Sequence, residues 1–214
     1  MKCVICLNGD PPEKALLDQY TKDSFVIVAD GACGFFRSYN MFADLIVGDF
    51  DSYRFDMAQK VLKPGGTVVK HNIEKDYTDG QLALSEALSR GYKDIVLLGA
   101  LGGRMDHSLE NIRLLYNTDD NIKISAKCND CEMFIVKRRV TVCSDEPCTV
   151  SIIPYTDEMQ IEKTSGFKYS ADGLTLTRLD STAHSGLSNV LVSNKGEICV
   201  KRGAALVIVY NRLY

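Results

Sequence analysis

The sequence lacks the long apolar run that a membrane-spanning helix requires. None of its hydrophobic stretches approaches the ~20 residues that cross a bilayer, and no charged N-terminal segment precedes a signal-type apolar stretch. Only five of the 214 residues are proline, which argues against long disordered linkers. We therefore expect a globular protein of the cytoplasm, without membrane contact, with one large domain or two small ones.

The sequence also lacks a large excess of either charge. Its formal net charge of -3 at pH 7 gives no general attraction to nucleic acid or to an anionic membrane. We expect no nucleic-acid partner, and an anionic ligand would have to be held by a few local side chains.

The eight cysteines include two pairs with zinc-site spacing, Cys3 with Cys6 and Cys128 with Cys131. On a strand, residues three apart point to opposite faces, so Cys3 and Cys6 could not readily hold one ion. The second pair would need ligands from elsewhere in the chain. Buried or free thiols in a reducing compartment are therefore favoured over structural zinc.

The N-terminal part of the chain alternates short apolar strands with helical segments. The strands are expected over residues 3–7, 25–29, 45–47, 67–69 and 94–98. A helix is expected after Pro11 and Pro12, and Pro64-Gly65-Gly66 is expected to break the chain before the fourth strand. Strands that are apolar throughout and separated by helices predict a parallel sheet covered on both faces.

An acidic loop, Gly48-Asp49-Phe50-Asp51-Ser52, follows the third of these strands. If the loop is extended, Asp49 and Asp51 point the same way, because side chains alternate along an extended chain. Two such carboxylates could share a hard cation such as Mg²⁺. A solvated turn explains the same residue types, so the loop alone leaves both interpretations open.

A second acidic segment contains Asp76 and Asp79. Thr78 and Gln81 form a predicted capping box, which places Asp79 in the first turn of a helix. Free amide groups and the helix dipole favour an acid there, so Asp79 could serve only the helix start. The other acidic residues nearby favour a role in a shared site.

The fifth strand ends in a glycine-rich loop, residues 99–103, followed by Arg104, Asp106 and His107. Backbone N–H groups, a helix N-terminus and a guanidinium suit phosphate oxygens. The loop is not a Walker A motif, because no Gly-Lys-Ser/Thr ending is present. Asp106 could be only the N-cap of the next helix and His107 a surface residue. The buried side of that helix is expected to carry Leu109, Ile112 and Leu115.

These polar loops all follow predicted strands directly. In open parallel sheets, ligands bind beyond the carboxyl ends of the strands. We therefore expect Asn8-Gly9, Asp30-Gly31, the acidic loop and the glycine-rich loop to share one edge. Carboxylates for Mg²⁺ and donors for phosphates at one edge are what a metal-nucleotide complex requires.

From about residue 131 the pattern becomes that of short strands separated by turns. They are expected over residues 133–136, 140–143, 149–153, 174–179, 190–192, 197–201 and 204–210. This pattern predicts an antiparallel sandwich or barrel. The sequence thus predicts two domains, 1–130 and 131–214.

Four motifs in this order resemble those of the thiamine pyrophosphokinases. They are Asp30-Gly31-Ala32, Gly48 to Ser52, Lys75 to Asp79, and Gly99 to His107. The resemblance implies transfer of the pyrophosphoryl group of ATP to the hydroxyethyl oxygen of thiamine, with release of AMP and a requirement for Mg²⁺. It implies an α/β catalytic domain that binds ATP and Mg²⁺, followed by a β-sandwich domain that binds thiamine and forms a homodimer.

The resemblance also implies roles for individual residues. Asp49, Asp51 and Asp79 would hold the metal and its phosphates, and Asp76 would lie in the same acidic shell. Nucleotide contacts would come from Asp30, Gly31, Gly102, Arg104 and Asp106.

Ser188 and Asn189 match the pair that contacts the substrate in the family, although by composition they form only a polar loop. Some family members place a tryptophan beside the thiamine ring, and this chain has none. Packing on the ring would therefore fall to a tyrosine, a phenylalanine or His184.

The implied mechanism is in-line attack of the thiamine hydroxyl on the β-phosphorus, with Asp76 or Asp79 accepting the proton. Two rival functions remain. Asp49-Phe50-Asp51 is similar to the D-x-D motif of haloacid-dehalogenase-type phosphatases, in which the first Asp is a nucleophile but usually follows the first strand. A non-catalytic nucleotide or thiamine-diphosphate sensor would bind the same ligands without turnover.

Overall fold

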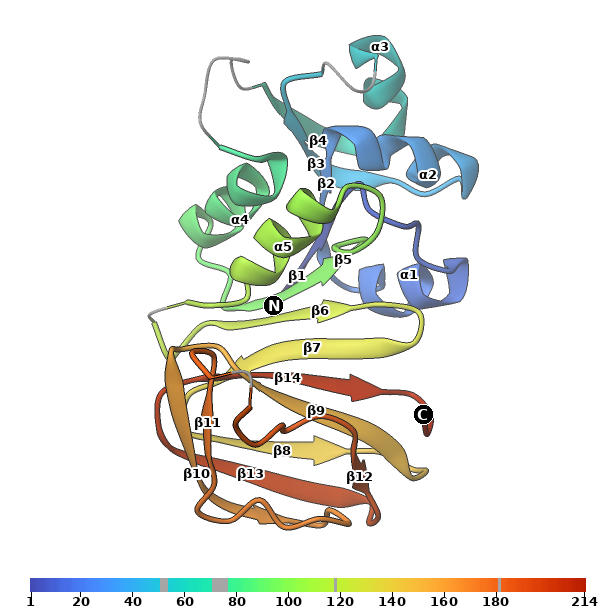
Figure 1. The fold of residues 1–214 in the computed structure, drawn as a ribbon. Coiled ribbons are helices and arrows are strands. Elements are labelled where there is room, and N and C mark those ends of the chain that lie inside the picture. Colours follow the sequence, from blue (N-terminus) through green and yellow to red (C-terminus); the bar gives the residue numbers. More distant parts are fainter. Residues whose placement is uncertain (51–53, 71–76, 118, 181) are drawn as a thin grey trace. The chain divides into compact units, whose positions relative to one another are not determined.

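The computed structural model describes residues 1–50, 54–70, 77–117, 119–180 and 182–214 (Figure 1). The chain forms two compact units, Met1–Asn129 and Asp130–Tyr214. In the described ranges, no helix is long and apolar enough to cross a membrane.

The first unit is a parallel sheet with helices between its strands. Its elements are β1 (Lys2–Cys6), α1 (Lys14–Thr21), β2 (Phe25–Ala29), η1 (Asp30–Ala32), α2 (Cys33–Ser38), β3 (Ala43–Gly48), α3 (Phe55–Ala58), η2 (Gln59–Val61), β4 (Leu62–Lys70), α4 (Asp79–Ser89), β5 (Asp94–Leu98), α5 (Met105–Arg113) and β6 (Lys123–Lys127). The strands lie in the order β6-β5-β1-β2-β3-β4, and every pair is parallel. The predicted mixed α/β fold is confirmed, although β6 was not predicted.

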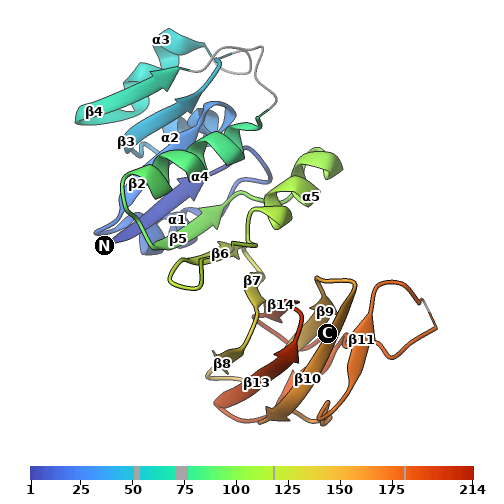
Figure 2. The same cartoon turned by 90° about the vertical axis from the view of Figure 1, so that its left-hand side faces the viewer.

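Both faces of this sheet are covered, which explains why its strands are apolar throughout. On one face, Val4 and Val28 belong to a buried cluster with Leu17 of α1 and Phe36 of α2. On the other, α4 packs against β1, β2 and β3. Figure 2 looks from the side of α4, which crosses in front of the strands while α1 and α2 lie behind them.

Strand β4 differs from the prediction at Pro64-Gly65-Gly66. These residues lie within the strand and do not break it. The pairing register shifts between Ala43 and Leu45 on β3, and Gly65 has a φ of 82°. β4 is at the edge of the sheet. An edge strand tolerates Pro64, which has no backbone N–H to donate, and the irregular backbone of Gly65.

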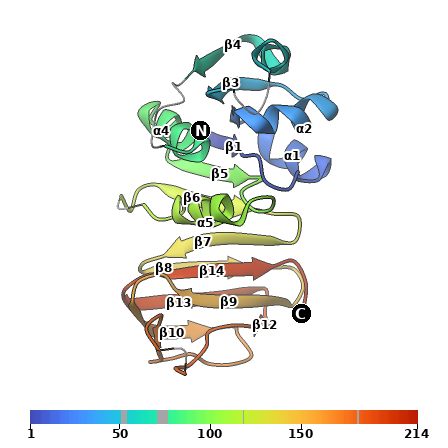
Figure 3. The same ribbon diagram turned by 45° about the horizontal axis from the view of Figure 1, so that its top comes forward.

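The second unit consists of short antiparallel strands. Its elements are β7 (Cys131–Val136), β8 (Arg139–Cys143), β9 (Cys148–Pro154), β10 (Glu158–Ser165), β11 (Thr175–Thr177), β12 (Asn189–Leu191), β13 (Lys195–Arg202) and β14 (Ala205–Tyr210). Strands β12-β9-β14-β7 run side by side, and β11-β10-β13-β8 form a separate sheet (Figure 3). β10 was not predicted from the sequence.

The two sets of strands in this unit share one core. Ile152 of β9 and Val207 of β14 belong to the same buried cluster as Met159 of β10 and Ile198 of β13. Inward-facing apolar residues from both sets thus form the single layer of side chains that is typical of a sandwich.

None of the eight cysteines, all of which lie in the described ranges, forms a disulfide. Cys6 packs in the cluster beneath α1 and α2, and Cys3 on the same strand points to the opposite face because side chains alternate. Burial raises the pKa of Cys3 to about 12. Burial, with a smaller contribution from the charge of Asp30, does the same for Cys33. These thiols are therefore protonated and unreactive in the folded protein.

Candidate active site

The loops after β1 and β5 lie together at the carboxyl edge of the sheet. β1 has β2 on one side and β5 on the other, so the strand order reverses between these loops. The Gly9 N–H donates to the Gly99 carbonyl at 2.8 Å, and the Asp10 N–H donates to the Leu101 carbonyl at 2.7 Å. The glycine-rich loop is thus joined to the loop after β1 at the point where open parallel sheets bind ligands.

Glycines let polar side chains from neighbouring strand ends pack closely. A Cβ built on Gly31 would lie 2.1 Å from Asn8 Nδ2, and one built on Gly48 would lie 2.5 Å from the Cβ of Asp30. These separations are far below van der Waals contact, so a side chain at Gly31 would have to displace the Asn8 side chain, and one at Gly48 would have to displace Asp30 or β3. The ends of β1, β2 and β3 are therefore locked side by side.

Asp30 is completely buried at the end of β2. Its charge helps to raise the pKa of the nearby Cys33 thiol, after the larger effect of burial on that thiol. This burial suits Asp30 to a supporting role beneath the strand ends better than to contact with a solvated nucleotide. Gly31, which follows it, is partly exposed.

Asp49 follows β3 directly and is partly exposed. The next residue, Phe50, has a left-handed backbone with a φ of 63°, and its ring packs edge-on against Phe55 at 5.0 Å between centroids. The extended loop that would point Asp49 and Asp51 the same way is therefore not present at Phe50. A left-handed non-glycine residue costs about 1–3 kcal/mol, a strain typical of functional loops. Asp51 itself lies outside the described residues.

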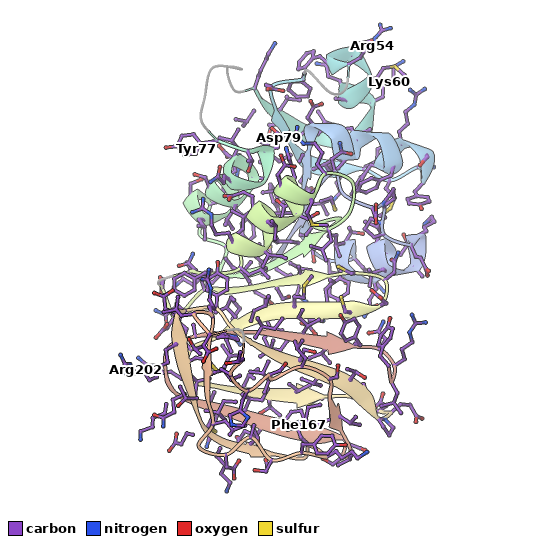
Figure 4. The ribbon with its side chains drawn as sticks, in the orientation of Figure 1. Arg54, Lys60, Tyr77, Asp79, Phe167 and Arg202 are labelled. Carbon is purple, nitrogen blue, oxygen red and sulfur yellow. The ribbon has the colours of Figure 1, made fainter. Side chains whose placement is uncertain are left out.

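Asp79 is the first residue of α4. The predicted capping box is confirmed: the Thr78 N–H donates to Gln81 Oε1 at 2.8 Å, and the Gln81 N–H donates to Thr78 Oγ1 at 3.3 Å. In Figure 4 the Tyr77 side chain points outward, whereas Asp79 lies on the side of the strand ends. The capping box thus fixes the helix start independently of Asp79. Asp76 lies outside the described residues.

The glycine-rich loop has left-handed backbone at Gly99, Gly102 and Gly103, with φ of 63°, 95° and 63°. A Cβ on Gly102 would lie 2.0 Å from Cγ of Asp10. A side chain at Gly102 would therefore have to displace the Asp10 carboxylate, and the left-handed backbone itself favours glycine there.

Arg104 occupies the N-cap position of α5, so the interpretation of Asp106 as the N-cap is wrong. Asp106 lies in the first helical turn and pairs with Arg104 through Nη2–Oδ2 and Nε–Oδ1 contacts of 2.5 and 3.1 Å. The hydrogen bond from Arg104 lowers the pKa of Asp106 to about 2 and raises that of Arg104. The backbone N–H of the exposed His107 donates to the same carboxylate at 3.0 Å.

The buried side of α5 is polar near its start, contrary to the prediction for Leu109, whereas Leu115 is buried as predicted. Leu109 is 61% exposed, whereas Ser108 and Asn111 are buried. Sequence reasoning missed both residues because apolar spacing favoured Leu109. The signal in the sequence was the spacing of Ser108 and Asn111, two polar residues three positions apart. They follow the glycine-rich loop, whose backbone groups need hydrogen-bond partners.

In the second unit, Asn189 holds the backbone of Tyr169. Its Nδ2 donates to the Tyr169 carbonyl at 2.7 Å, and its Oδ1 accepts from the Tyr169 N–H at 3.1 Å. The Tyr169 ring is 58% exposed, and Lys168 Nζ lies 5.2 Å from its centroid. Ser188 is exposed, with a φ of 57°. Tyr169 is a candidate ligand contact that sequence reasoning did not single out.

The carboxylates near the strand ends are hard oxygen donors, which suit Mg²⁺. Within the described ranges, no three His, Cys, Asp or Glu side chains gather closely enough to hold a metal by themselves. Mg²⁺ needs only one or two protein carboxylates when phosphate and water complete its shell. Asp49 and Asp79 therefore fit this metal by the chemistry of their oxygens.

A family model described as "Thiamin pyrophosphokinase, catalytic domain" matches residues 17–126. The chain belongs to the thiamine pyrophosphokinase family. It is 32% identical over 164 residues to thiamine pyrophosphokinase from Bacillus subtilis (strain 168), with 75% of each chain covered.

Solved structures of thiamine pyrophosphokinases have the same fold. The chain superposes on the Bacillus subtilis structure with a TM-score of 0.84 and 26% identity over the full length of both. For the Geobacillus thermodenitrificans structure the TM-score is 0.82 with 27% identity, covering 98% of this chain and 97% of that one. The yeast structure, at 18% identity, shares the fold with a TM-score of 0.78, and 98% of this chain and 85% of that chain are covered.

The match to the thiamine pyrophosphokinase catalytic domain spans most of the candidate site. Asp49, Asp79 and the glycine-rich loop all lie within residues 17–126, whereas Asn8 and Asp10 precede that segment.

Proposed function

We propose that this chain transfers the pyrophosphoryl group of ATP to the hydroxyethyl oxygen of thiamine, giving thiamine diphosphate and AMP. The observation that carries this proposal is the position of Asp49, Asp79 and the glycine-rich loop. All three follow strands or begin helices of the segment that matches the family's catalytic domain. The resemblance further supports a cytoplasmic homodimer.

The glycine-rich loop and the start of α5 suit the phosphates of ATP. The loop leads directly into the N-terminus of α5, where the helix dipole attracts anions, and Arg104 at the N-cap position adds a full positive charge. Arg104 is exposed and directs two of its nitrogens to Asp106. A guanidinium has five N–H donors, so it can contact a phosphate without leaving this partner.

Asp49 and Asp79, with Asp51 by family resemblance, would hold Mg²⁺. When bound, the metal would offset the negative charge of the triphosphate. The thiamine oxygen forms a bond to the β-phosphorus as the bond from that phosphorus to the α,β-bridging oxygen breaks. AMP leaves with the bridging oxygen and its electron pair. Asp79, or Asp76 by resemblance, accepts the hydroxyl proton.

Tyr169 is the best candidate to pack on the thiamine ring in a chain without tryptophan. Its ring is exposed, and Asn189 fixes its backbone from both sides. Asn189 thus supports the aromatic surface, and the exposed Ser188 beside it is left to contact the substrate. A fixed aromatic ring offers thiamine an apolar face with little entropy lost on binding.

The test is AMP release by the purified protein with ATP and Mg²⁺, measured with and without thiamine. Thiamine-dependent formation of AMP and thiamine diphosphate in equal amounts is expected. Phosphate release without thiamine would instead indicate a phosphatase. Ligand binding without any product would indicate a sensor.

A further inference from the structure

The buried polar face of α5 holds the backbone of the glycine-rich loop. Asn111 Nδ2 donates to the Ala100 carbonyl at 2.8 Å. Ser108 Oγ accepts from the Gly102 N–H at 3.1 Å and lies 3.2 Å from the carbonyl oxygens of Gly102 and Arg104. Ala100 is buried, so its carbonyl depends on Asn111 for a partner. The shape of the loop is thus set by two side chains that lie outside it.

The same face of α5 contacts the first turn of α4. Gln81 Nε2 donates to Glu110 Oε1 at 3.0 Å. A Cβ built on Gly80 would lie 2.9 Å from Asn111 Oδ1, which brings the two helices into direct contact there. Because Gly80 follows Asp79, Asn111 lies between the glycine-rich loop and the residue pair that begins α4. Figure 1 shows α4 and α5 side by side.

This arrangement matters because the loop and Asp79 would bind one ligand together. Phosphates on the loop and a carboxylate at the start of α4 act on the same nucleotide only if their separation is fixed before binding. A buried amide that is hydrogen-bonded to the loop on one side and packed closely against Gly80 on the other allows little displacement. We propose that Asn111 and Ser108 are positioning residues that fix the glycine-rich loop relative to Asp79 and thereby determine the affinity for ATP. This inference rests on the proposed function, because it takes ATP as the ligand of this edge.

The experiment compares Asn111→Ala and Ser108→Ala with the unchanged protein. ATP affinity is measured by calorimetry without thiamine, and KM for ATP and for thiamine is measured by AMP release. Each substitution should weaken ATP binding about three- to tenfold, the usual effect of losing one buried hydrogen bond. KM for thiamine should stay within about twofold, because neither residue lies in the second unit.

Two further variants separate positioning from general damage. Ser108→Thr keeps the hydroxyl and should restore most of the ATP affinity lost in Ser108→Ala. Asn121→Ala removes an exposed amide that donates to Asp119 Oδ1 at 3.0 Å, and it should leave ATP binding unchanged. Thermal unfolding of each variant shows whether it remains folded.

Unchanged ATP affinity in both alanine variants would overturn the proposal. A parallel rise of both KM values together with a lower Tm would also overturn it, because that is the result of a purely structural role. If the unchanged protein binds ATP but makes no AMP with thiamine, the proposed function fails while the calorimetry still decides this inference. If it binds no ATP, both fail.

Discussion

Gly48, the last residue of β3, lies directly against Asp30, the buried first residue after β2, and a Cβ on Gly48 would be 2.5 Å from that of Asp30. We expect Gly48→Ala to destabilise the protein by about 1–3 kcal/mol, because the added methyl group must displace β3 or Asp30. Turnover should fall as well, because Asp49 is the next residue. Urea unfolding and AMP release measure the two effects.

A double-mutant cycle tests whether this contact is the cause. In an Asp30→Gly background the added methyl group no longer meets a Cβ, so the cost of Gly48→Ala should shrink. An equal cost in both backgrounds would contradict the explanation.

Asp79→Ala should lower turnover by about 100-fold or more, because the site loses a carboxylate that holds the metal or accepts a proton. The fold should survive, since the Thr78–Gln81 capping box does not involve the Asp79 side chain. Steady-state AMP release and the unfolding free energy are the measurements. Near-normal turnover in Asp79→Ala would contradict a role for Asp79 in metal binding or proton transfer.

Thr78→Ala is the matched control for Asp79→Ala, because it disturbs the start of α4 without removing the carboxylate. It removes the N-cap side chain and should cost about 1 kcal/mol of stability, with a much smaller loss of turnover than Asp79→Ala. The opposite ranking of the two variants would show that Asp79 acts mainly on the helix.

The alternation of strands and helices could be predicted because a strand that is buried on both faces is apolar at every position. Ile5 and Val28 must be apolar wherever helices cover the sheet. β10 was missed because its outward positions carry charged residues. Met159 and Ile161 alternate with them and are the only strong apolar signal in its first half.

The site was harder to predict, because its parts depend on tertiary contacts. The left-handed backbone of Phe50 accompanies packing of its ring against Phe55, a residue beyond the acidic motif from which the loop was interpreted. Asn111 is buried because its amide finds the Ala100 carbonyl, a partner that only the folded chain supplies. Local patterns identified which loops meet, and long-range packing determined how their side chains are held.

Tyr169→Leu should raise KM for thiamine about tenfold and leave KM for ATP unchanged, because the aromatic surface is lost while an apolar side chain remains. Tyr169→Phe keeps the ring and should stay near the unchanged protein. A similar effect of both substitutions would assign the role to the hydroxyl, and no effect of either would exclude Tyr169 from the thiamine site.

Alkaline pH should destabilise the protein through its buried thiols. Burial raises the pKa of Cys33 to about 12, above the value of 9.0 for an accessible thiol. Its stabilising contribution is therefore complete below about pH 9 and is lost as the pH rises toward 12, because only the unfolded chain releases the proton. Each such thiol can contribute a slope of up to about 1.4 kcal/mol per pH unit.

Comparison with Cys33→Ala isolates this effect from the titration of other groups. The stability advantage of the unchanged protein over Cys33→Ala should shrink between pH 8.5 and 10.5, measured by urea unfolding in matched buffers. Cys143→Ala, at an exposed position, controls for loss of a thiol as such. A constant difference between the unchanged protein and Cys33→Ala would contradict the prediction, because it would mean that the Cys33 thiol has the same pKa in the folded and the unfolded chain.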